Sequence, residues 1–252
     1  MAKHNSYHRA PSRFTPEEAP TDKHYYKNIY YGEPHDKMFE KSRFHYIEKH
    51  VCYKHKSVLD IGCNTGFFIF EALDKGAKKV KGYEGSKAAY ELLSSYVDCT
   101  NDNITIKNCY FPLKENPNEK YDVVHLLNVV HHLGSDYGKT GPDDDLDGIK
   151  SDVLFQINNM AHWAEHLVFQ MGFNLHGDVN KPLFSNGTKK EMIEFIKSGI
   201  MNHWEIVSIG VAQSNNGYIS YFDLDPHNIA RDNSLGEFLN RPIFILKSLS
   251  SI

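Results

Sequence analysis

The sequence has few cysteines, no long apolar run and no internal repeat. Its four cysteines form no CxxC pair and no dense framework, which argues against a zinc ribbon and indicates a reducing compartment. The most apolar run, residues 123–130, is interrupted by His125 and Asn128 and falls short of the roughly 20 apolar residues that a membrane span requires. No apolar stretch follows the basic start, so no signal peptide is expected. These absences predict a cytoplasmic protein that does not contact a membrane.

The length and the distribution of charge predict one domain with an extension. The 252 residues carry a formal net charge of −4, but residues 1–56 hold 11 Lys and Arg against 7 Asp and Glu. We expect a polar, basic, aromatic extension over residues 1–35 and a single domain over residues 36–248. An acidic loop is expected at residues 134–148, and we interpret it as a solvated insertion near the rim of the active site.

Apolar runs alternate with helical patterns along the domain. Helices are predicted from about residue 36 and at 67–73, 86–97, 149–163 and 188–199. Strands are predicted at 56–63, 79–84, 104–108, 121–127, 166–170, 204–210 and 242–247, with 218–222 as an extra candidate. The alternation predicts an α/β fold with an open, mostly parallel, seven-stranded sheet and helices on both faces.

The turn after the first strand is the expected ligand site, because ligands of open α/β sheets bind at the carboxyl ends of the strands. It reads Asp60-Ile-Gly62-Cys63-Asn64-Thr-Gly66. Gly62 lets the backbone approach a ligand closely, and Gly66 opens the following helix. Glu84 ends the second strand and is placed to accept hydrogen bonds from both hydroxyls of a ribose.

These residues resemble the class I S-adenosylmethionine-dependent methyltransferases, over roughly residues 36–248. A nicotinamide site usually has GxGxxG, whereas this turn lacks the three-glycine spacing and has Asp60 two residues before Gly62. The resemblance implies a Rossmann-like sheet and S-adenosylmethionine as cofactor, with S-adenosylhomocysteine as product. It implies that Asp60 steadies the loop around the methionine amino group and that Glu84 holds the ribose, and it places the turn residues Gly62, Cys63, Asn64 and Gly66 along the cofactor.

The resemblance also implies roles for two further segments. Where the family often has an acid for the adenine amine, this chain has Asn108, whose amide oxygen can accept from that amine. The segment from Asn128 to Leu133 matches the stretch that flanks the transferring methyl group, so Asn128 is assigned to the cofactor site. His131 and His132 are the candidate catalytic bases, with packing or positioning as the alternative role.

Several specific chemistries are not expected. The Asp143–Gly148 segment opens like a calcium loop, but Leu154 stands where the bidentate Glu would be, so no metal is expected. Asn128-Val-Val-His131 is not the motif of amino-methylating DNA enzymes, and no Pro-Cys dipeptide supplies the nucleophile of the pyrimidine carbon-5 methylases.

The sequence predicts an enzyme that methylates an oxygen or nitrogen of a small molecule. An RNA acceptor is the first alternative, because the basic front end and the glycine turn distantly resemble enzymes that modify the wobble uridine of transfer RNA. The second is a non-catalytic subunit that binds S-adenosylmethionine, and a nicotinamide oxidoreductase is the third. Oligomeric state is not readable from the sequence.

Overall fold

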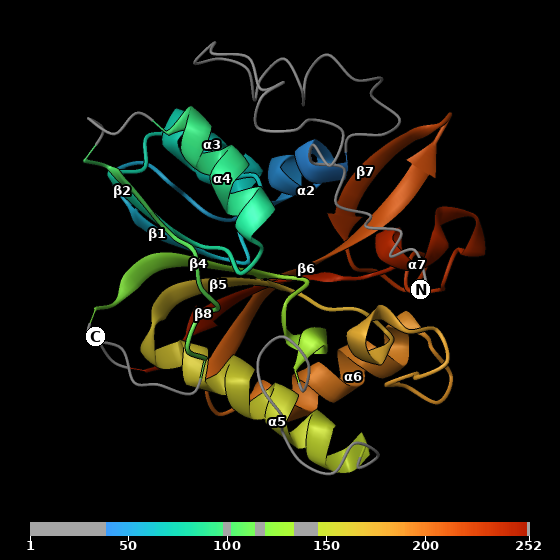
Figure 1. The fold of residues 1–252 in the computed structure, drawn as a ribbon. Coiled ribbons are helices and arrows are strands. Elements are labelled where there is room, and N and C mark those ends of the chain that lie inside the picture. Colours follow the sequence, from blue (N-terminus) through green and yellow to red (C-terminus); the bar gives the residue numbers. More distant parts are fainter. Residues whose placement is uncertain (1–38, 98–101, 114–118, 134–145, 251–252) are drawn as a thin grey trace.

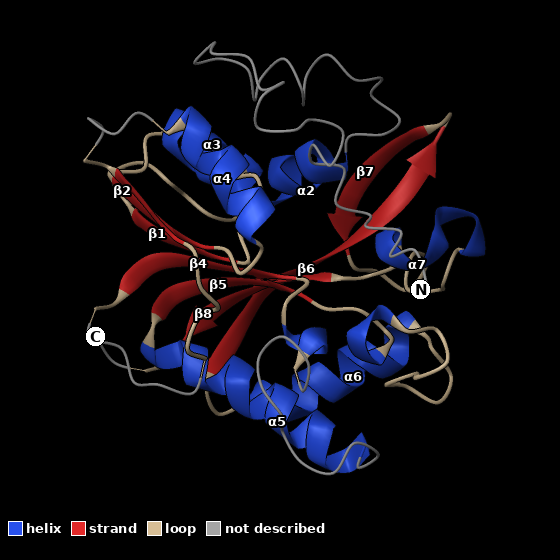
Figure 2. Cartoon of the chain, viewed as in Figure 1, coloured by secondary structure: helices blue, strands red, loops and turns tan. Residues whose placement is uncertain are grey.

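The computed structural model describes residues 39–97, 102–113, 119–133 and 146–250 (Figure 1). The expected extension at residues 1–35 and most of the acidic loop, residues 134–145, lie outside the described residues. The described elements alternate between helices and strands, as Figure 2 shows by colour.

One eight-stranded sheet organises the domain, in the order β3-β2-β1-β4-β5-β8-β6-β7. The strands are β1 Ser57–Ile61, β2 Lys79–Tyr83, β3 Ile104–Lys107, β4 Tyr121–Leu127, β5 Ala164–Gln170, β6 Trp204–Asn215, β7 Tyr218–Asp223 and β8 Ile243–Ser248. β1 to β5 pair in parallel, whereas β8, β6 and β7 are each joined to a neighbour in antiparallel register. The α/β class and the mostly parallel sheet are confirmed. The sheet has eight strands where seven were predicted, because segment 218–223 forms a full hairpin partner for the long β6.

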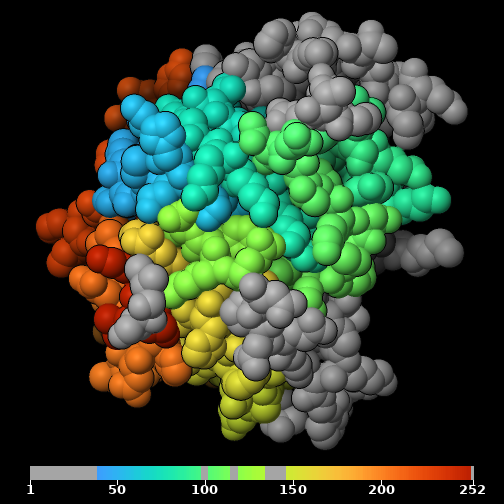
Figure 3. All heavy atoms as spheres, turned by 90° about the vertical axis from the view of Figure 1, so that its left-hand side faces the viewer, coloured from blue at the N-terminus to red at the C-terminus, as the bar shows by residue number. Residues whose placement is uncertain are grey.

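Helices cover both faces of this sheet. They are α2 Phe39–Ile47, α3 Phe67–Asp74, α4 Lys87–Tyr96, α5 Leu146–Asn159, α6 Lys189–Ile200 and the short α7 Gly236–Leu239. In Figure 1, α2, α3 and α4 lie on one side of the sheet and α5 and α6 on the other. In Figure 3, the blue and teal residues of the early part of the chain lie against the green and yellow residues that come later in the sequence.

The core explains why the helices sit where they do. α3 is almost wholly apolar and buries nearly every residue against β1 and β2, whereas α6 buries only one stripe, which includes Met192, Ile193 and Ile196. Ser86 caps α4 by accepting from the Ala89 amide, and Thr188 caps α6 by accepting from the Glu191 amide, 3.1 Å away. The predicted helix start at Thr188 is confirmed.

Strand order reverses at β1, which pairs with β2 on one side and β4 on the other. The carboxyl ends of β1 and β4 therefore flank the switch point at which open α/β sheets bind their ligands. The turn after β1 and the turn after β4 are the two segments that the fold places there.

Candidate functional site

The turn after β1 has a backbone that few residues tolerate. Gly62, Asn64 and Gly66 all have positive φ, at +70°, +49° and +86°. A Cβ on Gly66 would lie 2.5 Å from Leu93 Cδ1, and one on Gly62 would lie 3.0 Å from Val129 Cγ2. Glycine is therefore required at position 66 both for the dihedral angle and for the close approach of α4. The result is a tight turn that keeps the carboxyl end of β1 open to a ligand.

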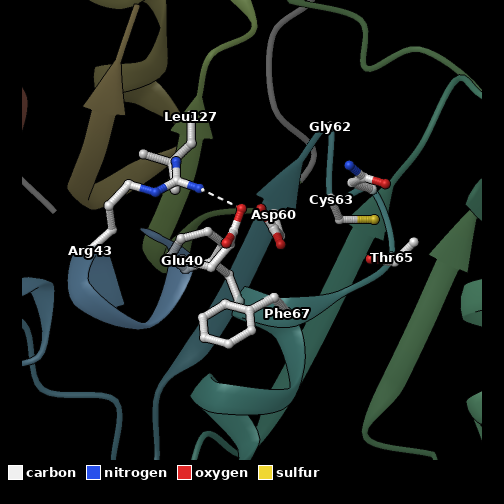
Figure 4. Close-up of a pocket in the computed structure, with 10 residues that line it drawn as sticks. Glu40, Arg43, Asp60, Gly62, Cys63, Thr65, Phe67 and Leu127 are labelled. Atoms are coloured by element: carbon white, nitrogen blue, oxygen red, sulfur yellow. Dashed lines mark hydrogen bonds and ion pairs between the residues drawn. The ribbon is translucent and has the colours of Figure 1, made fainter. Parts of the chain in front are cut away.

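A pocket opens beside this turn, between the end of β1 and helix α2. Its lining includes Asp60, Gly62, Cys63, Asn64 and Thr65, with Glu40 and Arg43 contributed by α2. Figure 4 shows Glu40 and Arg43 on the helix facing Asp60 at the end of the strand. Arg43 was not among the residues predicted from sequence, because its helix precedes the motif turn.

Two buried polar atoms at this pocket, one an acceptor and one a donor, have no hydrogen-bond partner among the described residues. Among the residues described, neither Asp60 Oδ2 nor Arg43 Nε makes a hydrogen bond, although both side chains are only 2% exposed. The remaining guanidinium nitrogens of Arg43 are engaged, NH1 with Gln170 Oε1 at 3.1 Å and NH2 with Glu40 Oε1 at 3.5 Å. A buried group without a partner costs free energy, so such atoms mark a place for a ligand. One carboxylate oxygen and one guanidinium N–H match the ammonium and the carboxylate of an amino-acid moiety.

The pKa of Asp60 is raised from 3.8 to about 7. The main cause is burial, which disfavours the charged form, and the negative charge of Glu84 acts in the same direction. Arg43 opposes the shift. Asp60 is thus a carboxyl that titrates near neutral pH and gains a counter-ion when an ammonium group binds.

His125, beside Asp60, does not provide a charged partner. It is fully buried in β4, and burial lowers its pKa from 6.5 to about 3, so the ring is neutral. Its Nε2 hydrogen-bonds the Tyr53 hydroxyl at 2.8 Å, while Nδ1 lies 3.9 Å from Asp60 Oδ1. The histidine that interrupts the apolar run in the sequence is therefore a structural residue beneath the site.

Glu84 lies at the end of β2 and anchors the turn. Its two carboxylate oxygens accept from the Asn64 amide at 2.7 Å and from the Ser86 amide at 2.6 Å. Burial raises its pKa, and the backbone donors oppose that shift. A carboxylate has about four lone-pair sites. Two bonds to the backbone thus leave Glu84 with capacity for both hydroxyls of a ribose.

The end of β3 adds a second wall beyond Glu84. Asn108 Nδ2 donates to the Glu84 carbonyl at 2.9 Å, which leaves the amide oxygen to accept from a ligand. Tyr110 is 48% exposed, and a Cβ on Gly85 would lie 2.3 Å from its ring. The ring thus covers Gly85 next to the predicted ribose site. The assignment of Asn108 to adenine stays a prediction, and Tyr110 is an aromatic neighbour that the sequence analysis missed.

The turn after β4 brings Asn128, His131 and His132 together. Asn128 has a φ of +62° and is 5% exposed. Its Nδ2 donates to Gln170 Oε1 at 3.0 Å, and its Oδ1 accepts from Arg241 at 2.7 Å. Both ends of the Asn128 amide are therefore engaged with protein. Its assignment to the cofactor stays a prediction.

The two histidines differ in their surroundings. His131 is buried, and its Nδ1 accepts from the Gly172 amide at 3.3 Å. That hydrogen bond requires the neutral tautomer with the proton on Nε2. His132 is half-buried, with its ring centroid 4.4 Å from that of His131. His132 is thus the more exposed of the two rings.

The turn residue Cys63 has a thiol directed into the core. It is 6% exposed, and burial raises the pKa of its thiol well above the usual range. Its amide and that of Gly62 both donate to the Tyr83 carbonyl.

Within the described part of the chain, no group of three or more His, Cys, Asp or Glu side chains is arranged to hold a metal ion. In the same part of the chain, no helix combines the length and the apolar character that crossing a membrane requires.

The polar groups around the turn match those of S-adenosylmethionine. Asp60 and Arg43 complement the ammonium and carboxylate of its methionine moiety, Glu84 has free capacity for a ribose, and Asn108 at the end of β3 has a free acceptor. The fit therefore rests on unpartnered buried atoms and on the donor set rather than on the shape of the turn alone.

Comparison with known proteins agrees with this geometry. Residues 59–165 match the family model described as a methyltransferase domain. Curated relatives include tRNA U34 carboxymethyltransferases from Nautilia profundicola, 24% identical over 93 residues, and from Helicobacter acinonychis, 34% identical over 89 residues. The alignments cover 36% and 32% of this chain and 30% and 32% of those relatives, so the chain spans about a third of their length.

Solved structures share the fold at low sequence identity. The N-methyltransferase NodS from Bradyrhizobium japonicum WM9, in complex with S-adenosyl-L-homocysteine, has a TM-score of 0.51 at 13% identity and covers 84% of this chain and 88% of its own. A chain from the Haloferax volcanii complex of the Trm112 methyltransferase activator with a methyltransferase has a TM-score of 0.55 at 12% identity, with 86% and 94% covered. The motif turn, the strand order and the methyltransferase-domain match together show that residues 59–165 form a methyltransferase domain, and the polar groups of its site fit S-adenosylmethionine as the cofactor.

Proposed function

We propose that this chain transfers the methyl group of S-adenosylmethionine to an oxygen or nitrogen of an RNA, with transfer RNA as the first candidate. The observation that carries methyl transfer is the pocket in which Asp60 Oδ2 and Arg43 Nε are buried without partners on either side of the position for an amino-acid moiety. The RNA acceptor is supported by the curated relatives, which are named as enzymes of tRNA U34.

The cofactor's sulfonium makes its methyl carbon electrophilic, and the protein's contribution is to hold and align the reactants. When the cofactor is bound, Asp60 would hold the ammonium, Arg43 the carboxylate and Glu84 the ribose. The acceptor's lone pair forms the new bond to the methyl carbon as the carbon–sulfur bond breaks, and S-adenosylhomocysteine leaves. The acceptor's proton passes to a base on the protein or to water.

His132 is the proposed base. Because His131 Nδ1 already accepts from Gly172, the Nε2 of His131 carries a proton and acts as a donor. The His132 ring lies tilted against the His131 ring and is half-buried. This division gives His131 the role of orienting the pair and His132 the role of accepting the acceptor's proton.

The charge on the described amino-terminal part favours a polyanionic acceptor. Between residues 39 and 56, the cationic side chains are Lys41, Arg43, Lys49, Lys54 and Lys56, and the acidic ones are Glu40 and Glu48. The region also has three histidines. An excess of cationic side chains attracts phosphate and releases counter-ions on binding.

A small-molecule acceptor is the second candidate, and the overall acidity favours it. The chain has a formal net charge of −4 and a sequence pI of about 6.4, whereas RNA-binding domains are usually basic. The curated relatives are matched over only about a third of their length, so the similarity covers only that part of them.

The deciding experiment supplies methyl-labelled S-adenosylmethionine to the purified protein with three acceptor pools: unmodified bulk transfer RNA, the same RNA after ribonuclease digestion, and a small-metabolite extract. The proposal predicts label in the intact RNA pool and none with Asp60→Asn, and the mass of the modified nucleoside reports which group was added. Label confined to the metabolite pool would replace RNA by a small molecule. Binding of S-adenosylmethionine without label in any pool would favour the non-catalytic subunit.

A further inference from the structure

A buried polar network lies at the carboxyl ends of β4 and β5, next to the cofactor pocket. Gln170 ends β5 and is fully buried. Its Oε1 accepts from Asn128 Nδ2 at 3.0 Å and from Arg43 NH1 at 3.1 Å, and its Nε2 donates to the Arg241 carbonyl at 2.9 Å. The network thus joins α2, the two central strands and the segment before β8.

Arg241 is the cationic end of this network. It is 7% exposed and precedes β8, outside the part of the chain that matches the methyltransferase-domain family. Its Nε lies 3.0 Å from Glu237 Oε2 and its NH2 lies 2.5 Å from the same oxygen, while NH1 donates to Asn128 Oδ1 at 2.7 Å. A buried guanidinium is costly unless it is paired and hydrogen-bonded. Here Glu237 neutralises the charge, and the remaining donor is directed at Asn128.

The hydrogen bond from Arg241 fixes the side chain of Asn128. Its φ of +62° lies in the left-handed region, which Asn adopts more readily than other residues with a Cβ. Arg241 holds the amide oxygen and Gln170 the amide nitrogen, so the side chain cannot flip without losing two buried hydrogen bonds. The next residues form the short helix Val130–His132, which bears both histidines.

Arg241 also lies close to His131. A Cβ on Gly172 would be 3.1 Å from Arg241 NH2 and 3.2 Å from His131 Cδ2, so the two side chains flank this glycine. The Gly172 amide is the donor to His131 Nδ1. Glu237 reaches the same loop, because its Oε1 accepts from the Phe173 amide at 3.0 Å. The Arg241–Glu237 pair therefore supports the histidines from two directions, through Asn128 and through the backbone at residues 172–173.

We infer that Arg241, neutralised by Glu237, is a positioning residue for methyl transfer. It fixes the Asn128 turn and the Gly172 loop, and so holds His131 in one tautomer and His132 against the acceptor. This role rests on the proposed function, since it acts through the histidines and touches neither cofactor nor acceptor. The Arg241 side chain makes no hydrogen bond to Asp60, Arg43 or Glu84, and the Asn128 amide that it does contact is engaged at both ends with protein, so loss of Arg241 is expected to leave cofactor binding largely unchanged.

The test compares Arg241→Met and Arg241→Lys with Arg231→Met. Arg231 lies in the same segment but is exposed, and its NH1 donates to the Gly187 carbonyl. Three quantities are measured: the affinity for S-adenosylhomocysteine, the ¹⁵N NMR signals of the histidine rings, and kcat and KM with bulk transfer RNA. For Arg241→Met we expect affinity within about threefold of wild type and a His131 Nδ1 signal that departs from the pure Nε2–H tautomer. We also expect kcat reduced on the order of 100-fold with little change in KM, because a small misplacement costs that much.

The outcomes separate the inference from the proposed function. Arg241→Lys keeps the charge but cannot bridge Glu237 and Asn128 with the same fork, so it should give an intermediate kcat and NMR signal, and it serves if Arg241→Met does not fold. An unchanged His131 signal in both Arg241 variants would overturn the positioning role, as would a loss of cofactor affinity that parallels the loss of kcat. If wild type transfers no methyl group to RNA, the proposed acceptor is wrong, while the NMR comparison still decides the role of Arg241.

Discussion

The raised pKa of Asp60 predicts a specific dependence of cofactor binding on pH. The ligand-free protein holds this carboxyl without a partner for Oδ2 and with a pKa of about 7. An ammonium group binds the ionised carboxylate, so affinity should increase as pH rises through that pKa. About one tenth of Asp60 is ionised at pH 6 and about nine tenths at pH 8, so the affinity for S-adenosylhomocysteine should rise about tenfold over this range.

Proton release provides a second measure of the same event. Binding an ammonium group next to Asp60 lowers its pKa, so close to one proton per site should leave at pH 6 and very little at pH 8. Isothermal titration calorimetry in buffers with different ionisation enthalpies measures this number directly. Neighbouring His125 does not interfere, because its pKa of about 3 keeps it neutral over the range.

Two controls test whether the Asp60 carboxyl causes this pH dependence. Methylthioadenosine has the adenosine but neither the ammonium nor the carboxylate, so its affinity should be nearly flat between pH 6 and pH 8. Asp60→Asn should abolish the pH dependence for S-adenosylhomocysteine and weaken its binding at pH 8. The reasoning is refuted if wild type binds S-adenosylhomocysteine equally well at pH 6 and pH 8, or if methylthioadenosine shows the same slope.

Four further outcomes follow from the same structure. Arg43→Met should weaken the affinity for S-adenosylhomocysteine about 10- to 100-fold and leave the affinity for methylthioadenosine unchanged, because a hydrogen bond to a charged group contributes about 1.5–3 kcal/mol. Lys41→Met on the same helix is the control in the calorimetric titration. Glu84→Gln should weaken both ligands by a similar factor, since both carry the ribose, and equal affinities would contradict the assignment of Glu84. Gly66→Ala should lower the free energy of unfolding by about 2–5 kcal/mol, because the new Cβ clashes with Leu93 in addition to the cost of positive φ. The control is Gly217→Ala, where φ is +83° and the space around the new Cβ is open. It should lower the free energy of unfolding by only about 1–2 kcal/mol in the same denaturation experiment. Without ligand, the stability of wild type should fall as pH rises from about 4 to 7, because the folded state binds the Asp60 proton more tightly than the unfolded state; Asp60→Asn should flatten that part of the profile.

The grouping of the cofactor candidates at one edge of the sheet could be predicted because most of them lie in one turn. Asp60, Gly62 and Gly66 belong to one turn, and Glu84 ends the next strand, so the order of elements places them together once the strands are recognised. The sheet class followed from the same alternation. The eighth strand was only an extra candidate because segment 218–223 is short and mostly exposed, and its pairing with β6 defines it.

The arginines could not be predicted, for a physical reason. Arg43 and Arg241 are far from the motif turn in sequence, and each gains its role from tertiary contacts: Arg43 with Gln170 across 127 residues, and Arg241 with Asn128 across 113. In the sequence they look like ordinary surface cations, because nothing local indicates that a guanidinium will be buried. The difference between His131 and His132 is likewise set by Gly172, 41 residues away from His131.

The most direct test of the account is the crystal structure of the protein with S-adenosylhomocysteine. The account predicts the ammonium within hydrogen-bond distance of Asp60 Oδ2, the carboxylate at Arg43 Nε and the ribose hydroxyls on Glu84. A ligand bound elsewhere, or bound with its amino-acid moiety directed away from Asp60 and Arg43, would contradict it.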